Sequence, residues 1–341
     1  MKSFYLHVPY CLHLCNYCDF YKKPFKKSFK EYEKYLESTW LQTLQEHQDQ
    51  LEPLKTLYLG GGTPSLWTSQ FFEDFFLPKI SFEQNYEWTM EIDPYNLDLS
   101  NIQRWMNIGV NRLSFGIQSL NNKALKILDR QHSREDVIQI LHWLKDKNVN
   151  YSVDFLIGIP IERDILSELE EVLSFNPSNM STYILTVPQS YTHYKFLPED
   201  QLIVQEYLAV KKYLESKKFL HYEVSNYGKI LSQHNQVYWN QESYMAMGPS
   251  ASGYCSVSKK RYKWLPNKTI EQDILTEEAF ILESFYLGLR QFTIKTEYLK
   301  SFKNLKDLEE EGFLKGNKIL PKGILLLDFI AQKLSLDLRA Y

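Results

Sequence analysis

Three cysteines stand close together near the start of the chain: Cys11, Cys15 and Cys18, with the spacing C-x3-C-x2-C. Thiols this close are typical of metal ligation, because a disulfide framework spreads an even number of cysteines along a short secreted chain. They supply three of the four ligands that a cubane iron–sulfur cluster needs, so one iron would stay open to another ligand. The alternative is a zinc site completed by His7 or His13.

Polar and glycine residues recur where predicted strands end. The run Gly60–Gly62 with Thr63 follows one strand, and glycines there allow backbone N–H groups to approach a polar ligand. Glu91, Gln118 and Asp154 stand in or just after three other strands. A carboxylate in a parallel strand is costly unless it is paired or faces a site, so we expect these side chains to lie near the cysteines. A structural polar group is the alternative for each of them taken singly.

Short apolar segments and amphipathic segments alternate along the chain. The apolar segments predict six strands, over residues 4–8, 56–59, 88–92, 112–117, 151–157 and 180–185, and most lack alternation, as expected of strands covered on both faces. Helices are predicted between them, the first with a capping-box spacing at Ser28 and Glu31 and the others over residues 99–107, 122–128, 134–145, 165–173 and 201–216. This order predicts an α/β fold with a partial (β/α)6 TIM-like barrel, in which the loops after the strands share one face.

The pattern changes beyond about residue 225. A helix is predicted over residues 279–289, and a helix, a hairpin and a helix over residues 305–334 predict a winged-helix-like module. We therefore expect two domains: a barrel with the cysteine loop over residues 1–225, and a C-terminal domain over residues 226–341. From residue 301 on, seven Lys and Arg residues are balanced by six Asp and Glu residues, so DNA binding by this module is not favoured.

Composition and charge exclude several classes of protein. The 341 residues include 39 Lys and Arg against 42 Asp and Glu, a net charge of −3, which argues against a chain built mainly to bind nucleic acid. No apolar run reaches the roughly 18 residues of a membrane span, and the N-terminal residues lack the apolar region and cleavage site of a signal peptide. We therefore expect a soluble, cytoplasmic protein. Cys255 lies among small residues and is expected to be a small buried side chain.

The segment from Tyr5 to Phe20 resembles the cluster-binding segment of the radical S-adenosylmethionine (radical SAM) superfamily. More narrowly, it is similar to the family that contains oxygen-independent coproporphyrinogen dehydrogenase and the heme chaperone branch HemW. The similarity covers nearly the whole chain, and its further motifs are Gly60–Pro64, Glu91–Pro94, Arg112–Ser119, Leu128–Ser133, Val153–Pro160, His221–Asn226 and His234–Trp239.

This resemblance implies a set of cofactors and contacts. It places a [4Fe–4S] cluster on Cys11, Cys15 and Cys18, with the amino and carboxylate groups of S-adenosylmethionine on the open iron. The residues that it assigns to S-adenosylmethionine are Tyr5, Tyr17, Gly61, Gly62, Thr63, Glu91, Gln118, Arg130 and Asp154. The implied partners are heme or a porphyrin, a heme-acceptor protein, and an electron donor such as flavodoxin or ferredoxin.

Three features favour the heme chaperone branch. Phe20 stands where the dehydrogenases carry a fourth cysteine, no N-terminal arm precedes the first strand, and the motif His-Asn-x-x-Tyr-Trp begins at His234. We therefore expect a chaperone that binds heme and passes it to acceptor proteins. Oxidative decarboxylation of coproporphyrinogen III is the alternative function. The chain departs from the chaperone pattern at residues 187–190 and at Ser250–Gly253, where a histidine is absent.

Two interpretations are open for His234 and two for a group of lysines near the cysteines. His234 is the expected heme ligand, because imidazole is a common axial ligand and the aromatic residues of its motif offer a flat apolar surface. Its alternative role is to lock the domain junction. His7 is expected next to the cluster ligands rather than on heme. The lysines at 22, 23, 26, 27 and 30 predict a solvated surface, with contact to porphyrin propionates or to a reductant protein as the alternative.

Overall fold

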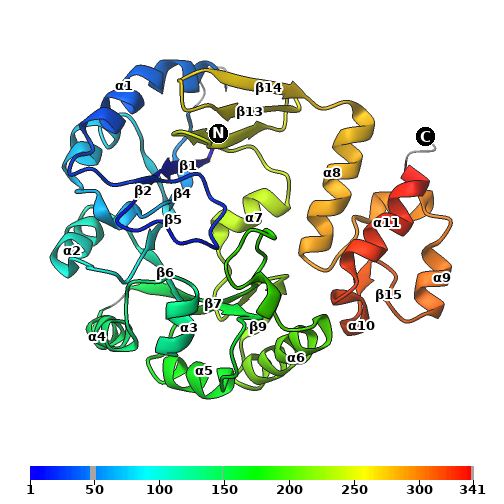
Figure 1. The fold of residues 1–341 in the computed structure, drawn as a ribbon. Coiled ribbons are helices and arrows are strands. Elements are labelled where there is room, and N and C mark those ends of the chain that lie inside the picture. Colours follow the sequence, from blue (N-terminus) through cyan, green and yellow to red (C-terminus); the bar gives the residue numbers. More distant parts are fainter. Residues whose placement is uncertain (47–50, 148, 339–341) are drawn as a thin grey trace.

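A computed structural model describes the chain except for residues 47–50, 148 and 339–341 (Figure 1). Its central sheet has nine strands in the described residues. Seven of them are parallel neighbours, and six of these seven lie within the first 225 residues. In spatial order these six are β1 (Ser3–Val8), β4 (Leu54–Gly61), β5 (Phe82–Ile92), β6 (Arg112–Gln118), β7 (Asn150–Ile157) and β8 (Asn179–Ile184). The predicted partial (β/α)6 barrel is therefore confirmed.

Helices cover the outside of this curved sheet (Figure 1). They are α1 (Lys30–Gln45), α2 (Leu99–Asn107), α3 (Asn122–Ile127), α4 (Arg134–Lys145), α5 (Ile165–Leu173) and α6 (Asp200–Ser216). The capping box predicted at Ser28 and Glu31 is wrong, because α1 has Phe29 at its N-cap and no side-chain cap. A complete capping box forms at Ser133 and Asp136, at the start of α4. The aromatic stripe of α1 explains its position, since Phe29 stacks on the buried Trp67 at 5.9 Å.

The sheet continues beyond the first 225 residues. Strand β9 (Leu220–Glu223) pairs with β10 (Asn226–Gly228), which is antiparallel to β8, and β11 (Met245–Met247) runs parallel to β1 at the other edge. The expected domain boundary at residue 225 therefore passes between two paired strands. The main apolar core extends from Phe4 to Trp264, and a second core begins at Phe285. We propose that the separate C-terminal unit begins at α8 (Glu277–Arg290).

The remaining elements are short. Strands β2 (Tyr10–Cys11) and β3 (Lys23–Pro24) flank the cysteine loop, α7 (Gln233–Trp239) packs next to β4, and β12 (Ser252–Cys255), β13 (Lys260–Trp264) and β14 (Ile270–Ile274) form a small sheet. Short helical turns lie at Pro64–Leu66, Phe72–Phe76, Tyr194–Phe196 and Thr296–Ser301. The winged-helix-like end contains α9 (Leu305–Glu310), β15 (Leu314–Lys315), β16 (Lys318–Ile319), α10 (Pro321–Ile324) and α11 (Leu327–Leu338). None of the helices in the described ranges combines the length and apolar character of a membrane span.

Candidate functional site

A cavity of about 380 Å³ opens at the carboxyl ends of the parallel strands, beside the cysteine loop. The structure brings to its walls every predicted cluster and S-adenosylmethionine residue except Tyr5. These residues are Cys11, Cys15, Cys18, Tyr17, Gly61, Gly62, Thr63, Glu91, Gln118, Arg130 and Asp154. They come from the loops or ends of separate strands, so the alternating strand and helix order is what gathers them.

Tyr5 lies elsewhere than predicted. Its ring stacks on Tyr58 and its hydroxyl donates to Nδ1 of His7 at 3.0 Å, while Nε2 of His7 donates to the Tyr21 carbonyl at 2.8 Å. Tyr58, not Tyr5, lines the cavity, and its hydroxyl donates to Glu91 at 2.8 Å. Tyr58 was not predicted from the sequence. Side chains two residues apart lie on the same face of a strand, so Tyr58 shares a face with Gly60, the first residue of the glycine run.

The glycine run packs directly against the cysteine loop. Gly61 has φ +107°, and a Cβ atom there would lie 2.5 Å from the His7 ring. A Cβ on Gly62 would lie 2.7 Å from the Tyr10 carbonyl oxygen. The N–H groups here were expected to donate to a ligand, which the structure does not support. The Gly61 N–H donates to Glu91, the Gly62 N–H to the Val8 carbonyl and the Thr63 N–H to the Tyr10 carbonyl. Glycine is required here for the close approach of two backbones.

Two carboxylates lie buried in the cavity wall. Glu91 accepts from Tyr58 and from the Gly61 N–H at 2.9 Å, and burial raises its pKa to about 7. Asp154 accepts from the Ser114 hydroxyl at 3.3 Å, and burial raises its pKa to about 6. The Oδ1 atom of Asp154 is buried and has no hydrogen-bond partner among the described residues. A buried acceptor without a partner fits a donor from a bound ligand, such as a ribose hydroxyl.

Arg130 connects the cysteine loop to the strand ends. One guanidinium nitrogen lies 3.8 Å from the Cys15 sulfur, and another lies 3.2 Å from Asp93 and donates to the Gly116 carbonyl at 2.6 Å. Asp93 was not singled out by the sequence, although it follows Glu91 by two residues. The fixed guanidinium places a positive charge beside the thiols, where it favours the thiolate form.

The surroundings of the three cysteines are suited to a bound cluster. Burial raises the pKa of Cys11 to about 11, and burial also raises the pKa of Cys15. The neighbouring cysteines add to both increases. Buried thiols of this kind become ligands when a metal supplies positive charge. No three His, Cys, Asp or Glu side chains in the described part of the chain converge on a point suited to a single metal ion. A cubane does not require such convergence, because each thiolate binds a different iron.

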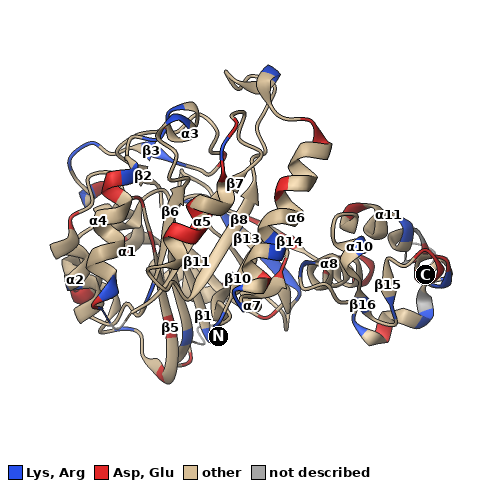
Figure 2. Cartoon of the chain, turned by 90° about the horizontal axis from the view of Figure 1, so that it is seen from below, with Lys and Arg blue, Asp and Glu red and all other residues tan. Residues whose placement is uncertain are grey.

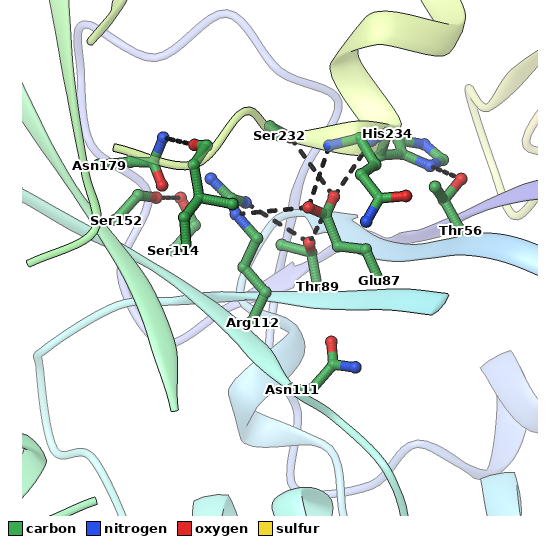
Figure 3. A network of polar contacts seen from close by, with 12 residues as sticks. Thr56, Glu87, Thr89, Asn111, Arg112, Ser114, Ser152, Asn179, Ser232 and His234 are labelled. Atoms are coloured by element: carbon green, nitrogen blue, oxygen red, sulfur yellow. Dashed lines mark hydrogen bonds and ion pairs between the residues drawn. The ribbon is translucent and has the colours of Figure 1, made fainter. Parts of the chain in front are cut away.

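His234 does not have the geometry of a heme ligand. Its side chain is buried, and its two ring nitrogens form hydrogen bonds with Thr56 at 2.8 Å and with Tyr238 at 2.7 Å. Burial lowers its pKa to about 3. Figure 3 shows the imidazole within a buried polar network that also holds Glu87 and Arg112. His234 does not itself line the cysteine cavity: its ring stacks on Tyr58, which does. These contacts leave neither ring nitrogen free for heme iron, and they favour the alternative interpretation, in which His234 locks the domain junction.

Three other side chains of types that can bind heme iron differ in accessibility. His132 is buried and donates from Nε2 to the Ile117 carbonyl at 3.1 Å. Cys255 is only partly buried and lines a different cavity, beside Met1. His13 is accessible: it lines the cysteine cavity, its side chain is 35% exposed, and its Nε2 lies 2.8 Å from Asp129. Of these three, only His13 lines the cysteine cavity.

The mouth of the cavity is apolar. Phe20 is 62% exposed, and Tyr183 and Ile184, at the carboxyl end of β8, are 41% and 48% exposed. Sequence reasoning used Phe20 only for the absence of a cysteine and did not identify the other two. Exposed aromatic and aliphatic side chains around one opening mark a surface that binds a partly apolar ligand.

Comparisons with known proteins agree with this geometry. The family model described as the radical SAM superfamily matches residues 5–175. The chain is 30% identical to the heme chaperone HemW of Lactococcus lactis, over 85% of this chain and 82% of that protein. It is 31% identical to the heme chaperone HemW of Synechocystis sp., over 84% of this chain and 77% of that protein. The solved structure of coproporphyrinogen III oxidase (HemN) from Escherichia coli has a TM-score of 0.81 at 17% identity and covers 98% of this chain and 90% of its own, which shows a shared fold.

Proposed function

Because the chain belongs to the radical SAM superfamily and to its heme chaperone HemW family, we propose that it binds heme and passes it to an acceptor protein. A [4Fe–4S] cluster and S-adenosylmethionine serve this function. The observation that carries the proposal is the identity of 30–31% with two heme chaperones over more than four fifths of the chain. The likeness to coproporphyrinogen III oxidase, at 17% identity, concerns the fold and does not favour that second activity.

The residues of the cavity wall suit both cofactors. Cys11, Cys15 and Cys18 would hold the cluster, which supplies one-electron redox chemistry when bound. Asp154 offers an unpartnered acceptor to a ribose hydroxyl, and Glu91 is held at the strand end by two hydrogen bonds. Together with the close-packed glycine backbone, these side chains would orient the ligand at the strand ends.

We place heme at the apolar mouth of the same cavity. Phe20, Tyr183 and Ile184 present apolar surface to a porphyrin face, and Lys22 lines the same cavity, where it suits a propionate. His13 is the proposed iron ligand. Its Nε2 lies 2.8 Å from the Asp129 carboxylate and is buried without a hydrogen-bond partner among the described residues, so a small rotation of the ring would let it donate to Asp129. An imidazole with a carboxylate at one nitrogen and the other nitrogen free is the common arrangement of a metal-ligating histidine.

Heme titration of three variants tests this assignment. His13→Ala should weaken heme binding and change the absorbance spectrum of the bound heme, because the iron loses an axial ligand. His234→Ala should leave the spectrum unchanged, and His193→Ala, on a neighbouring loop, is the matched control. An unchanged spectrum in His13→Ala would refute the ligand assignment. Absence of heme binding by the wild-type protein, with turnover of coproporphyrinogen III, would refute the chaperone function.

The compartment follows from the same thiols. An oxidising compartment would pair cysteines as close as Cys15 and Cys18, whereas a reducing one keeps them available to iron. We therefore propose a cytoplasmic location, with a heme-acceptor protein and a one-electron donor as partners. Fractionation of the native host, with detection of the protein by antibody, tests the location.

A further inference from the structure

Five lysines lie within residues 22–30, directly after the cysteine loop. We call this set the basic collar: Lys22, Lys23, Lys26, Lys27 and Lys30. All except Lys22 are exposed, no acidic residue lies among residues 22–30, and no ion pair to any of the five occurs in the described structure. Figure 2 shows this stretch as blue ribbon around β3. Five unpaired positive charges stand out on a protein whose net charge is −3.

The basic collar is attached to the backbone of the cysteine loop. Strand β3 pairs with β2, so that Lys23 lies opposite Tyr10 and Pro24 opposite Cys11. The Phe25 N–H donates to the Cys11 carbonyl at 2.8 Å, and the Lys22 ammonium group donates to the Cys18 carbonyl. These bonds fix Lys22 and Lys23 next to the cysteine loop, and the other three lysines follow within seven residues.

An exposed apolar patch lies within the same loop. Leu12 is 42% exposed, Leu14 is 38% exposed, and Phe20 is the most exposed of the three. Cys15 and Cys18 are themselves only partly buried. A small apolar centre with a charged rim is typical of transient electron-transfer interfaces, which bury little area and dissociate quickly. The partly exposed thiols bring the site within short range of a partner docked there.

We propose that the basic collar is the docking surface of an acidic one-electron donor protein that reduces the cluster. The inference rests on the proposed function, because it requires the cluster on the three cysteines. One electron leaves the reduced centre of the donor and enters the cluster, which becomes more negative by one charge. No bond is made or broken and no proton moves. The lysines act on the encounter: opposite charges raise the association rate and orient the partner.

The position of the basic collar argues against two other anions. Only Lys22 lines the cysteine cavity, so a porphyrin within the cavity mouth reaches one lysine of the five through its propionates. An extended polyanion such as RNA would meet the excess of acidic residues on the rest of the protein. A compact acidic protein contacts the collar and the apolar patch together without covering more of the surface.

The test compares two double charge reversals in the full-length, iron-reconstituted protein. K23E/K26E changes two exposed lysines of the basic collar. K315E/K318E changes two exposed lysines that pair across the β15–β16 hairpin of the C-terminal unit, and it is the matched control. Reduction of the cluster is followed by the loss of its visible absorbance in anaerobic stopped flow. The probes are a reduced flavodoxin, as the acidic donor protein, and photoreduced deazariboflavin, as a small reductant.

With flavodoxin, K23E/K26E should be reduced at least tenfold more slowly than the wild-type protein at low ionic strength. The wild-type rate should fall with added salt, and the K315E/K318E rate should match it within twofold. Iron content and the deazariboflavin rate should be equal in all three proteins. An unchanged flavodoxin rate in K23E/K26E overturns the inference, as does a loss of heme affinity in this variant without a change in rate. Failure of the wild-type protein to take up iron refutes the proposed function instead.

Discussion

The carboxylate of Glu87, on strand β5, accepts a hydrogen bond from the backbone N–H of His234 at 3.1 Å. The same carboxylate accepts from the Gln233 N–H at 3.0 Å and lies 3.9 Å from Nε of Arg112. A residue of the barrel interior therefore supplies the polar partners for the first turn of α7, a helix from beyond the expected domain boundary. The motif that contains His234 holds two parts of the chain together.

Glu87→Ala should lower the free energy of unfolding by about 3–5 kcal/mol, because it leaves the buried guanidinium of Arg112 without its carboxylate. The two side chains are 4% and 5% exposed, so water does not replace the lost partner. Urea unfolding followed by circular dichroism measures the change. Glu83→Ala, near the start of the same strand, is the control: it removes an ion pair with Lys2 at the surface and should cost no more than about 1 kcal/mol. A loss below about 1 kcal/mol in Glu87→Ala would contradict the proposed joint.

The buried imidazole of His234 should make the protein less stable in acid. Its pKa is lowered by burial to about 3, whereas an imidazole in the unfolded chain has a pKa near 6.5. Between these values the unfolded state binds more protons, so the free energy of unfolding falls as the pH falls from about 6.5 towards 3. His234→Gln should reduce this slope by about 1.4 kcal/mol per pH unit.

Urea unfolding at a series of pH values between 4 and 8 measures that slope. The exposed His142 provides the control, and His142→Gln should have the slope of the wild-type protein. Glu91 acts in the opposite direction, because burial raises its pKa to about 7, and its contribution is lost as the pH rises through that value. The comparison of variants removes this common background. Equal slopes in His234→Gln and in the wild-type protein would show that the imidazole is not held neutral.

Each of the variants Cys11→Ala, Cys15→Ala and Cys18→Ala should lose most of the iron and sulfide that the wild-type protein takes up under anaerobic reconstitution. The reason is that a cubane held by two thiolates lacks a protein ligand on two of its irons. Cys255→Ala should keep full iron content, since Cys255 lines a separate cavity. Uptake of one zinc per chain, with no iron, would instead favour the alternative of a zinc site.

Asp154→Asn should weaken binding of S-adenosylmethionine to the cluster-loaded protein by about tenfold, because a charged acceptor contributes roughly 1.5–3 kcal/mol to a hydrogen bond. Isothermal titration calorimetry measures the affinity. Glu162→Gln, an exposed carboxylate on the loop that follows the same strand, is the control. Unchanged affinity in Asp154→Asn would mean that the unpartnered Oδ1 atom does not face the ligand.

The positions of the strands, and the fact that the site residues meet at their carboxyl ends, were predictable because the local sequence determines both. Strands buried on both faces, such as Val153–Ile157, read as apolar runs, and the loops after parallel strands meet on one face. The cysteine spacing is likewise local. These features explain why Glu91, Gln118 and Asp154 were placed correctly at the cavity from positions far apart in the chain.

The expectations that differ from the structure concern how far along a strand a side chain lies, which segments bury it, and which strands pair across long stretches of sequence. Tyr5 was expected to contact S-adenosylmethionine, but it lies near the start of β1, where its ring stacks on Tyr58 and does not line the cavity. His234 has an aromatic motif that suits a porphyrin, yet the insertion of α7 against β4 buries it. Nothing near residue 225 in the sequence indicates that β11 pairs with β1.

The pairing of β11 with β1 has a consequence for the synthesis of the chain. Phe4 lies opposite Met245, so β1 waits during synthesis for a partner about 240 residues behind it. At roughly 5–20 residues per second, this delay is on the order of ten to fifty seconds. Throughout that interval one edge of the strand that leads into the cysteine loop is unpaired and open to other nascent chains. Strand β1 is thus a segment on which a ribosome-associated chaperone would act during synthesis.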